Sequence, residues 1–276
     1  MEQVEFQSQD GTKLAGYRWP APRSSRGTIL IVHGLAEHAG RYGHVARRLT
    51  DAGWTVVAVD LRGHGRSDGK RGHVSRWADY TADVQAAITK LTTEPPLLLA
   101  HSMGGLVALD FVREHAASVR GLVLSAPLLG LLLEVPAWKR ALAVGLSRVV
   151  PSLALPSDVR PDHLSHDRAV VDAYTSDPLV FRTATARWFR ELTKAMRRVR
   201  EAAPSGSLPV FATWGTDDRI VDPLAIAAWC SAWGGKVKAV TPHGLYHEVL
   251  NEPGDEVMAP MIAWLDAHAA SARAAK

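Results

Sequence analysis

Ser102 stands in a stretch whose residue types are typical of a serine held for nucleophilic attack. The apolar run Leu97–Ala100 ends at the segment His101–Gly105, and a helix-like pattern of apolar residues follows. A buried strand, a tight turn with serine at its apex and a helix that begins with small residues make up a nucleophile elbow. The usual pattern is G-x-S-x-G, and Ala100 replaces its first glycine. Taken alone, this stretch fits a serine that caps a helix equally well.

Candidates for the acid that would support such a serine follow later in the chain. A serine hydroxyl needs an imidazole to take its proton, and the imidazole needs a carboxylate to hold its tautomer. Elbow enzymes place the acid and then the histidine in loops after later strands. After the apolar strand Leu208–Trp214 come Asp217 and Asp218, and spacing alone does not choose between them. Asp222 precedes Pro223 and fits a helix N-cap instead.

Two histidines follow the next strand, Val237–Val240, and either one satisfies the order that the chemistry requires. His243 stands close to the end of the strand, while His247 stands farther out, before the apolar Val249. The spacing favours His247 as the general base and leaves His243 as an alternative.

The oxyanion of a tetrahedral intermediate needs two backbone N–H donors. One comes from the residue after the serine, which is Met103, and the other from a loop after an earlier strand. Gly34 and Leu35 directly follow the apolar strand Gly27–Val32. We expect the second donor to be Leu35, because Gly34 lets the backbone come close.

The elements that must position these residues are apolar strands that alternate with helical patterns. This alternation predicts an α/β fold with a mostly parallel central sheet, helices on both faces and a helical cap insertion. We assign residues 1–127 and 206–276 to the core and 128–205 to the cap. Within these units we expect helices over about 74–92, 183–201 and 255–270, and an irregular polar segment over 157–180.

Composition and charge exclude several classes of protein. The chain has 276 residues, a formal charge of +4 and no long run of Lys and Arg, so we expect no binding to nucleic acid. The single cysteine rules out an internal disulfide, and no metal-binding motif occurs, so we expect no metal or other cofactor. The N-terminal segment lacks the apolar part of a signal peptide, and no apolar run approaches the length of a membrane span. We therefore expect a cytoplasmic protein.

One stretch within the cap suggests contact with a membrane surface. The segment 136–150 is amphipathic, and its Trp138, Lys139, Arg140 and Arg148 suit a helix that rests on lipid. The same apolar face would also serve to close a site beneath it. Peripheral membrane contact through the cap is therefore one of two expectations for this stretch.

Five motifs in this order resemble the monoacylglycerol lipase and lysophospholipase family of α/β-hydrolases, of the serine aminopeptidase S33 type. They are His33–Tyr42 (HGLAEHAGRY), Asp60–Val74 (DLRGHGRSDGKRGHV), His101–Gly105 (HSMGG), Gly215–Pro223 (GTDDRIVDP) and Gly244–Glu252 (GLYHEVLNE). The resemblance spans nearly the whole chain and is weakest in the cap. The family's G-x-x-D pattern implies that Asp218 is the acid, and its G-x-x-H pattern implies that His247 is the base.

The resemblance implies an α/β-hydrolase fold and a serine carboxylester hydrolase that releases fatty acid from monoacylglycerol through an acyl-enzyme at Ser102. Lysophospholipase and short- or medium-chain carboxylesterase activities are the alternatives. A ligand-binding protein without catalysis is disfavoured, because all three members of a triad are in place. The loop after Val32 that contains Gly34 and Leu35 is called the oxyanion loop below. We expect Glu37, His38 and Arg41 to hold this loop by hydrogen bonds and charge pairs rather than to act on the substrate.

Overall fold

The computed structural model describes residues 1–22, 24–132, 147, 149–157, 159–201 and 206–274 of the chain. The strands are β1 Glu2–Gln7, β2 Lys13–Trp19, β3 Thr28–Val32, β4 Thr55–Val59, β5 Leu97–His101, β6 Gly121–Ser125, β7 Ala154–Pro156, β8 Thr183–Thr185, β9 Val210–Thr213 and β10 Val237–Val240. The helices are α1 Gly43–Asp51, α2 Ala78–Leu91, α3 Met103–His115, α5 Arg168–Ser176, α6 Ala186–Glu201, α7 Pro223–Ala232 and α8 Met258–Ala274, with 3₁₀ turns at Ala39–Tyr42, Ala116–Ser118 and Pro161–His163.

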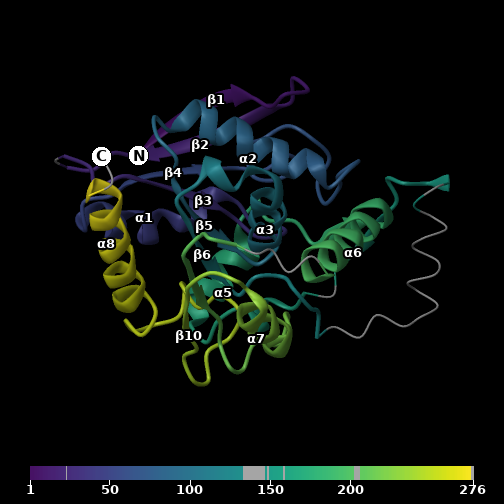
Figure 1. Cartoon of the computed structure of the whole chain (residues 1–276). Helices are drawn as coiled ribbons and strands as arrows, with labels where there is room; N and C mark the ends of the chain where they lie inside the picture. Colours follow the sequence, from purple (N-terminus) through teal and green to yellow (C-terminus); the bar gives the residue numbers. More distant parts are fainter. Residues whose placement is uncertain (23, 133–146, 148, 158, 202–205, 275–276) are drawn as a thin grey trace.

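A sheet runs through the molecule in the order β1-β2-β4-β3-β5-β6-β9-β10, and the strand labels in Figure 1 follow this order down the view. β1 and β2 are antiparallel to their neighbours, and the other six strands of this sheet are parallel to one another. These six are β4, β3, β5, β6, β9 and β10. The predicted mostly parallel sheet is confirmed. Because the parallel strands point the same way, the loops after Val32, Val59, His101 and Thr213 meet at one edge, where ligands bind in such sheets.

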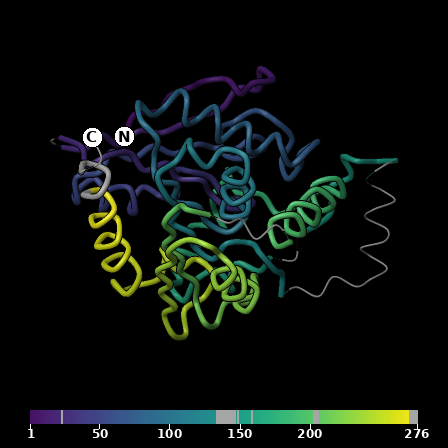
Figure 2. Tube along the Cα trace, viewed as in Figure 1, coloured from purple at the N-terminus to yellow at the C-terminus, as the bar shows by residue number. Residues whose placement is uncertain are grey.

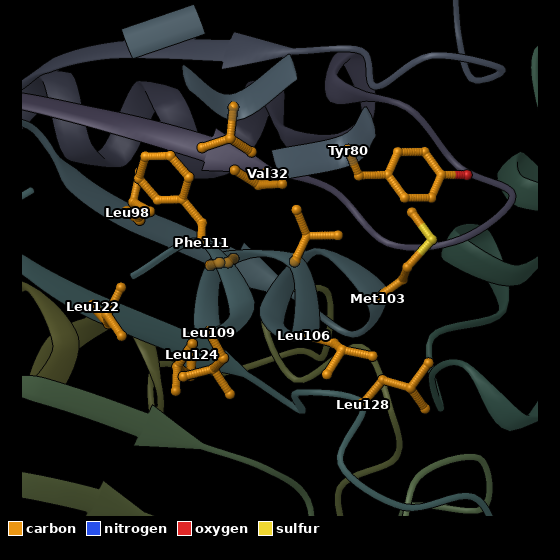
Figure 3. Packing of buried hydrophobic residues seen from close by; sticks show 14 of the residues in the cluster. Val32, Tyr80, Leu98, Met103, Leu106, Leu109, Phe111, Leu122, Leu124 and Leu128 are labelled. Carbon is orange, nitrogen blue, oxygen red and sulfur yellow. The ribbon is translucent and has the colours of Figure 1, made fainter. Parts of the chain in front are cut away.

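Side chains alternate between the two faces of the sheet, and helices cover both faces. Along β3, Leu30 and Val32 point to one face, and Ile29 and Ile31 point to the other. The first face packs against α2, α3, α6 and α7, and Figure 3 shows this layer around Val32. The second face packs against α1 and α8, which lie side by side in Figure 1. The predicted helices on both faces are confirmed.

Two helices of the core begin later than their sequence pattern predicts. α2 begins at Ala78 rather than near Val74, because a turn precedes it: the Asp79 carboxylate accepts the backbone N–H of Arg76 at 3.0 Å. Val74 and Trp77 are nevertheless buried, so these apolar residues belong to the core without being helical. α8 likewise begins at Met258 rather than at residue 255.

The chain leaves the sheet after β6 and returns to it at β9, and the residues between, numbers 128–205, are called the cap segment below. Figure 2 shows the described part of this segment in teal and green. Its described part contains α5, α6 and the antiparallel pair of β7 and β8. The first residues of the predicted helix over 183–201 form β8, because they pair with β7, and the helix α6 begins at Ala186.

The prediction of an irregular segment over 157–180 is wrong where α5 forms. Asp167 caps this helix, because its carboxylate accepts the N–H of Ala169 at 2.8 Å. Val171 and Tyr174 are buried on its inner side. The helix is only nine residues long, so its apolar pattern was too short in the sequence to separate it from the polar residues on either side.

The residues that suggest membrane contact, Trp138, Lys139, Arg140 and Arg148, lie outside the described residues. Peripheral contact through the cap segment therefore stays a prediction. In the described part of the chain no helix has the length and apolar character that crossing a bilayer requires.

Candidate active site

Ser102 lies between β5 and α3 in a backbone conformation that L-residues rarely adopt, with φ 51° and ψ −117°. Its N–H donates to the Ser125 carbonyl at 2.9 Å, and its own carbonyl accepts the N–H groups of Leu106 and Leu128 at 3.2 and 2.9 Å. Although Ser102 occupies the N-cap position of α3, its side chain makes no capping hydrogen bond. The interpretation of this serine as a plain helix cap is therefore wrong, and the strained turn is that of a nucleophile elbow.

The two glycines after Ser102 let α3 approach the sheet. A Cβ atom at Gly104 would clash with the Val32 carbonyl oxygen, and one at Gly105 would lie 2.7 Å from Pro127 Cβ. A side chain at Gly104 would push the helix away from β3, and one at Gly105 would push it away from Pro127, which follows β6. Ala100, which stands where the elbow pattern usually has glycine, lies fully buried inside β5 without a positive φ.

Ser102, His247 and Asp218 are brought together from three separate loops. His247 Nε2 lies 2.9 Å from Ser102 Oγ, and His247 Nδ1 lies 2.7 Å from Asp218 Oδ2. All three residues are buried, whereas Asp217 and His243 are exposed. The alternatives that spacing left open therefore stand apart from the serine, and a proton can pass from the hydroxyl to the imidazole along this chain of hydrogen bonds.

The Asp218 carboxylate is fixed by its own loop after β9. Its Oδ1 accepts the backbone N–H groups of Ile220 and Val221 at 2.8 and 3.0 Å, which turns Oδ2 toward His247. Burial opposes the charged form, but the His247 imidazole and these hydrogen bonds outweigh it and lower the pKa of Asp218. Asp222 caps α7 as predicted, because its carboxylate accepts the Leu224 N–H.

The electrostatics of the site suit a general base. Burial disfavours the charged imidazole, but the Asp218 carboxylate and its hydrogen bond outweigh burial and raise the pKa of His247. The ring of His101 lies 4.8 Å from the ring of His247 and accepts or donates one hydrogen bond with Ser125 Oγ at 3.0 Å. Burial and the neighbouring His247 lower the pKa of His101 to about 4, so this second imidazole stays neutral beside the first.

Leu35 and Met103 lie where two N–H donors are expected. Met103 is the first residue of α3, whose N-terminal dipole favours negative charge. A Cβ atom at Gly34 would lie 3.2 Å from Ser102 Cβ, so the loop that contains Leu35 passes directly beside the serine. Within the described chain, neither the Leu35 nor the Met103 N–H donates to a protein acceptor.

A buried ion network joins the oxyanion loop to the loop of His247. Glu37 Oε1 accepts the Gly34 N–H at 2.6 Å, and Glu37 Oε2 accepts from Arg41 at 2.8 Å. Arg41 also binds Glu248 through two hydrogen bonds of 2.6 and 2.8 Å. Burial opposes the charge on Glu37, but Arg41 and its other partners lower the pKa of this carboxyl to about 2. The expectation that Glu37 and Arg41 hold the oxyanion loop is confirmed.

A second buried carboxylate, Glu252, ties the loop of His247 to the cap segment. It accepts the N–H of Tyr246 at 3.1 Å, the N–H and Nδ1 of His166 at 2.9 Å each, and the hydroxyl of Ser165 at 3.0 Å. The Glu248 N–H donates directly to the carbonyl of Leu164 at 2.8 Å. The residues on both sides of His247 therefore depend on residues 164–166 of the cap segment.

Sequence reasoning missed the roles of Glu248 and Glu252, although both stand in the motif around His247. Their partners lie far away in the chain, at Arg41 and at Ser165 and His166, so only the folded chain brings these contacts together. The signal that the sequence offered was two acidic residues four positions apart beside the candidate base. Among the described residues no group of three or more His, Cys, Asp and Glu is arranged to hold a metal ion.

The sequence of this chain is similar to the sequences of known lipases. The model of the family described as serine aminopeptidase, S33, matches residues 23–254. Phospholipase YtpA of Bacillus subtilis is 34% identical over 245 residues, which cover 87% of this chain and 94% of that protein. A monoacylglycerol lipase of Mycolicibacterium smegmatis is 32% identical over 274 residues, which cover 95% of this chain and 96% of that protein.

Solved structures agree with these relatives. The crystal structure of the monoacylglycerol lipase of Paleococcus ferrophilus superposes with a TM-score of 0.86 at 32% identity, and the match covers 92% of this chain and 99% of that one. A monoglyceride lipase variant from Saccharomyces cerevisiae superposes with a TM-score of 0.83 at 21% identity, over 97% of this chain and 94% of that one, which shows the shared fold.

Proposed function

The chain belongs to the serine aminopeptidase S33 family of α/β-hydrolases and is a carboxylic ester hydrolase, and from this premise we propose that it releases fatty acid from monoacylglycerol. The observation that carries the proposal is the hydrogen-bonded chain from Ser102 Oγ through His247 to Asp218, with distances of 2.9 and 2.7 Å. In this proposal Ser102 is the nucleophile, His247 the general base and Asp218 the acid that orients it.

The reaction proceeds through an acyl-enzyme. Ser102 Oγ attacks the ester carbonyl while His247 Nε2 takes the hydroxyl proton, and the N–H groups of Leu35 and Met103 bind the oxyanion. The intermediate collapses, and His247 returns the proton to the glycerol oxygen as it leaves. Water then attacks the acyl-enzyme with His247 again as the base, and the second collapse releases the fatty acid and restores the Ser102 hydroxyl.

The charges beside Ser102 support a neutral alcohol as the leaving group. Arg41 is a cation that a phosphate group would seek, but it is buried and already bound by Glu37 and by Glu248. One positive and two negative charges in this network add to −1. A phosphate brought next to it would be repelled, whereas the uncharged glycerol group would not be.

Lysophospholipase activity is the alternative, and the likeness to the phospholipase of Bacillus subtilis favours testing it. A general carboxylesterase is the other alternative within the same chemistry. The three differ in the group that leaves and in the acyl chain, and they share the proposed triad.

A substrate panel tests the proposal. Initial rates are measured on monoacylglycerols of increasing chain length, on lysophosphatidylcholines with the same acyl chains and on nitrophenyl esters, with the wild type and Ser102→Ala. We expect higher kcat/KM on monoacylglycerol than on the lysophospholipid of equal chain length, and labelling of the wild type alone by a fluorophosphonate. Hydrolysis by Ser102→Ala at the wild-type rate would overturn the proposed mechanism, and a preference for lysophospholipid would overturn the proposed substrate.

A further inference from the structure

His33, the first residue after β3, makes two hydrogen bonds that the reaction scheme above does not use. Its Nδ1 lies 2.7 Å from the Gly34 carbonyl oxygen, and its Nε2 lies 3.0 Å from the Leu61 backbone nitrogen. The side chain is fully buried, so both bonds form away from water. His33 thus connects the oxyanion loop to Leu61, which lies in the loop after β4.

The two partners fix which ring nitrogen of His33 carries the proton. A backbone N–H can only donate, so Nε2 must accept from Leu61 and carries no hydrogen. A carbonyl oxygen can only accept, so Nδ1 carries the hydrogen and donates it to Gly34. The neutral Nδ1–H form is the state that satisfies both bonds.

The Gly34 carbonyl belongs to the same peptide unit as the Leu35 N–H. The peptide unit is planar and trans, so its C=O and N–H point in opposite directions, and a bond that fixes one also fixes the other. A hydrogen bond accepted by the carbonyl also polarises the N–H of that unit and makes it a stronger donor. His33 therefore acts on the Leu35 N–H from the far side of the peptide.

We infer that His33 is a positioning residue for the oxyanion hole, which aims and polarises the Leu35 N–H through the Gly34 carbonyl. The inference rests on the proposed function, in which Leu35 supplies one of the two donors. Glu37 complements it by holding the preceding peptide, since its carboxylate accepts the Gly34 N–H at 2.6 Å. Both peptide units that flank Gly34 are then fixed before substrate binds.

The surroundings of His33 keep it in this state. Burial lowers the pKa of His33, although Asp60 and Glu37 act in the opposite direction. The neighbouring His64 ring lies 5.0 Å away, and burial together with His33 lowers the pKa of His64 to about 3. The lowered pKa values favour the neutral form of both rings, and the two hydrogen bonds of His33 select its Nδ1–H tautomer.

Two substitutions separate the bonds of His33. In His33→Asn the side-chain amide nitrogen takes the place of Nδ1 and still donates to Gly34, but the acceptor for Leu61 is lost. In His33→Gln the longer amide reaches the place of Nε2 and accepts from Leu61, but the donor to Gly34 is lost. We expect kcat/KM of His33→Gln to fall about 10- to 100-fold with little change in KM, because one oxyanion donor is misdirected. His33→Asn should keep most of the rate.

A thionoester substrate supplies a readout that a merely structural role would not move. Sulfur is larger than oxygen and a poorer acceptor, so an intact oxyanion hole favours the oxoester over its thionoester. The rate ratio of oxoester to thionoester should fall in His33→Gln and stay at the wild-type value in His33→Asn. Equal losses of rate in both variants with an unchanged ratio would overturn the inference.

A measurement on the wild type keeps the inference testable if either variant fails to fold. The ¹⁵N chemical shifts of an assigned His33 side chain distinguish the Nδ1–H from the Nε2–H tautomer, and the inference requires Nδ1–H at neutral pH. An Nε2–H or doubly protonated ring would overturn it. If the wild type hydrolyses no ester, or Ser102→Ala remains active, the proposed function itself fails. If hydrolysis depends on Ser102 but the ratio does not respond to His33, only this inference fails.

Discussion

The oxyanion loop takes its main backbone partners from the core, whereas the loop that carries His247 takes partners from the cap segment. Gly34 is held on its N–H by Glu37 and on its carbonyl by His33, both from the same loop. The Ala39 N–H donates to Asp60 at the end of β4. On the other side, the Glu248 N–H donates to the cap carbonyl of Leu164.

The cap segment also contacts the oxyanion loop, but at residues that lie farther from the reacting groups. His38 Nε2 lies 2.9 Å from Asp177, and the Phe181 N–H reaches the Ala36 carbonyl at 3.4 Å. Neither contact falls on the peptide that carries the Leu35 N–H. A displacement of residues 164–166 should therefore disturb the general base before it disturbs the oxyanion hole.

We call the oxyanion loop and the loop that carries His247 the two halves of the site. The largest effect is expected at Ser102, where these two halves meet. Ser102→Ala removes the nucleophile, and kcat/KM on a monoacylglycerol should fall by about 10⁴-fold or more. The matched control is Ser231→Ala, an exposed serine on α7, which should leave the rate unchanged. Residual turnover within tenfold of the wild type would mean that the nucleophile lies elsewhere.

A loss of nearly this size is expected from Asp218→Asn, which affects the histidine half alone. The backbone N–H groups of Ile220 and Val221 bind Oδ1, so the amide oxygen must stay there and the NH₂ group must face His247. The imidazole then adopts the wrong tautomer, which costs about 10³- to 10⁴-fold in kcat. Rates of Asp217→Asn, an exposed neighbour, provide the comparison, and equal losses in the two variants would contradict the assignment of the acid.

Glu252→Gln tests the dependence of the histidine half on the cap segment. The carboxylate accepts four hydrogen bonds, and the NH₂ group of glutamine would leave some of these donors without an acceptor. We expect kcat to fall about tenfold through misplacement of His247, with an unchanged ratio of oxoester to thionoester rates. Glu256→Gln, at an exposed position nearby, is the control. A changed ratio would show that the two halves are not separate.

The smallest effect is a displacement of the pH profile. The Asp218 carboxylate stabilises the protonated imidazole, so the pKa of His247 lies above the ordinary 6.5 despite burial. The neutral base is therefore lost as pH falls through a value above 6.5, and kcat/KM measured from pH 5 to 9 should show its acidic midpoint there. The ratio of oxoester to thionoester rates should stay constant across the same range. A midpoint below 6.5 would contradict the coupling to Asp218.

The sequence predicted the sheet and the loops of the site because the signals for both are local. Apolar strands such as Thr28–Val32 are buried on both faces, and the residues after them must lie at one edge of a parallel sheet. The spacing of the residues did not show whether Asp217 or Asp218 is the acid, since neighbouring residues differ only in the direction of their side chains. The motif resemblance implied Asp218, and the structure brings that residue to His247.

What the sequence could not predict are contacts between distant segments. Glu252 meets Ser165 across 87 positions, and no local pattern encodes that meeting. One local choice also escaped prediction: the residues before α2 form a turn because the Asp79 carboxylate accepts the N–H of Arg76, three positions earlier. The prediction for Glu37 and Arg41 succeeded because both lie within the loop that they hold.

The positive φ of Ser102 has a consequence for the evolution and design of this chain. A non-glycine residue in such a conformation costs about 1–3 kcal/mol of folding free energy, and alanine at this position would carry the same cost. Glycine would not, so Ser102→Gly should withstand more denaturant than Ser102→Ala, in contrast to the usual ranking of these two residues. Selection for stability alone would remove the serine. Its presence at this position therefore records selection for turnover at the expense of stability.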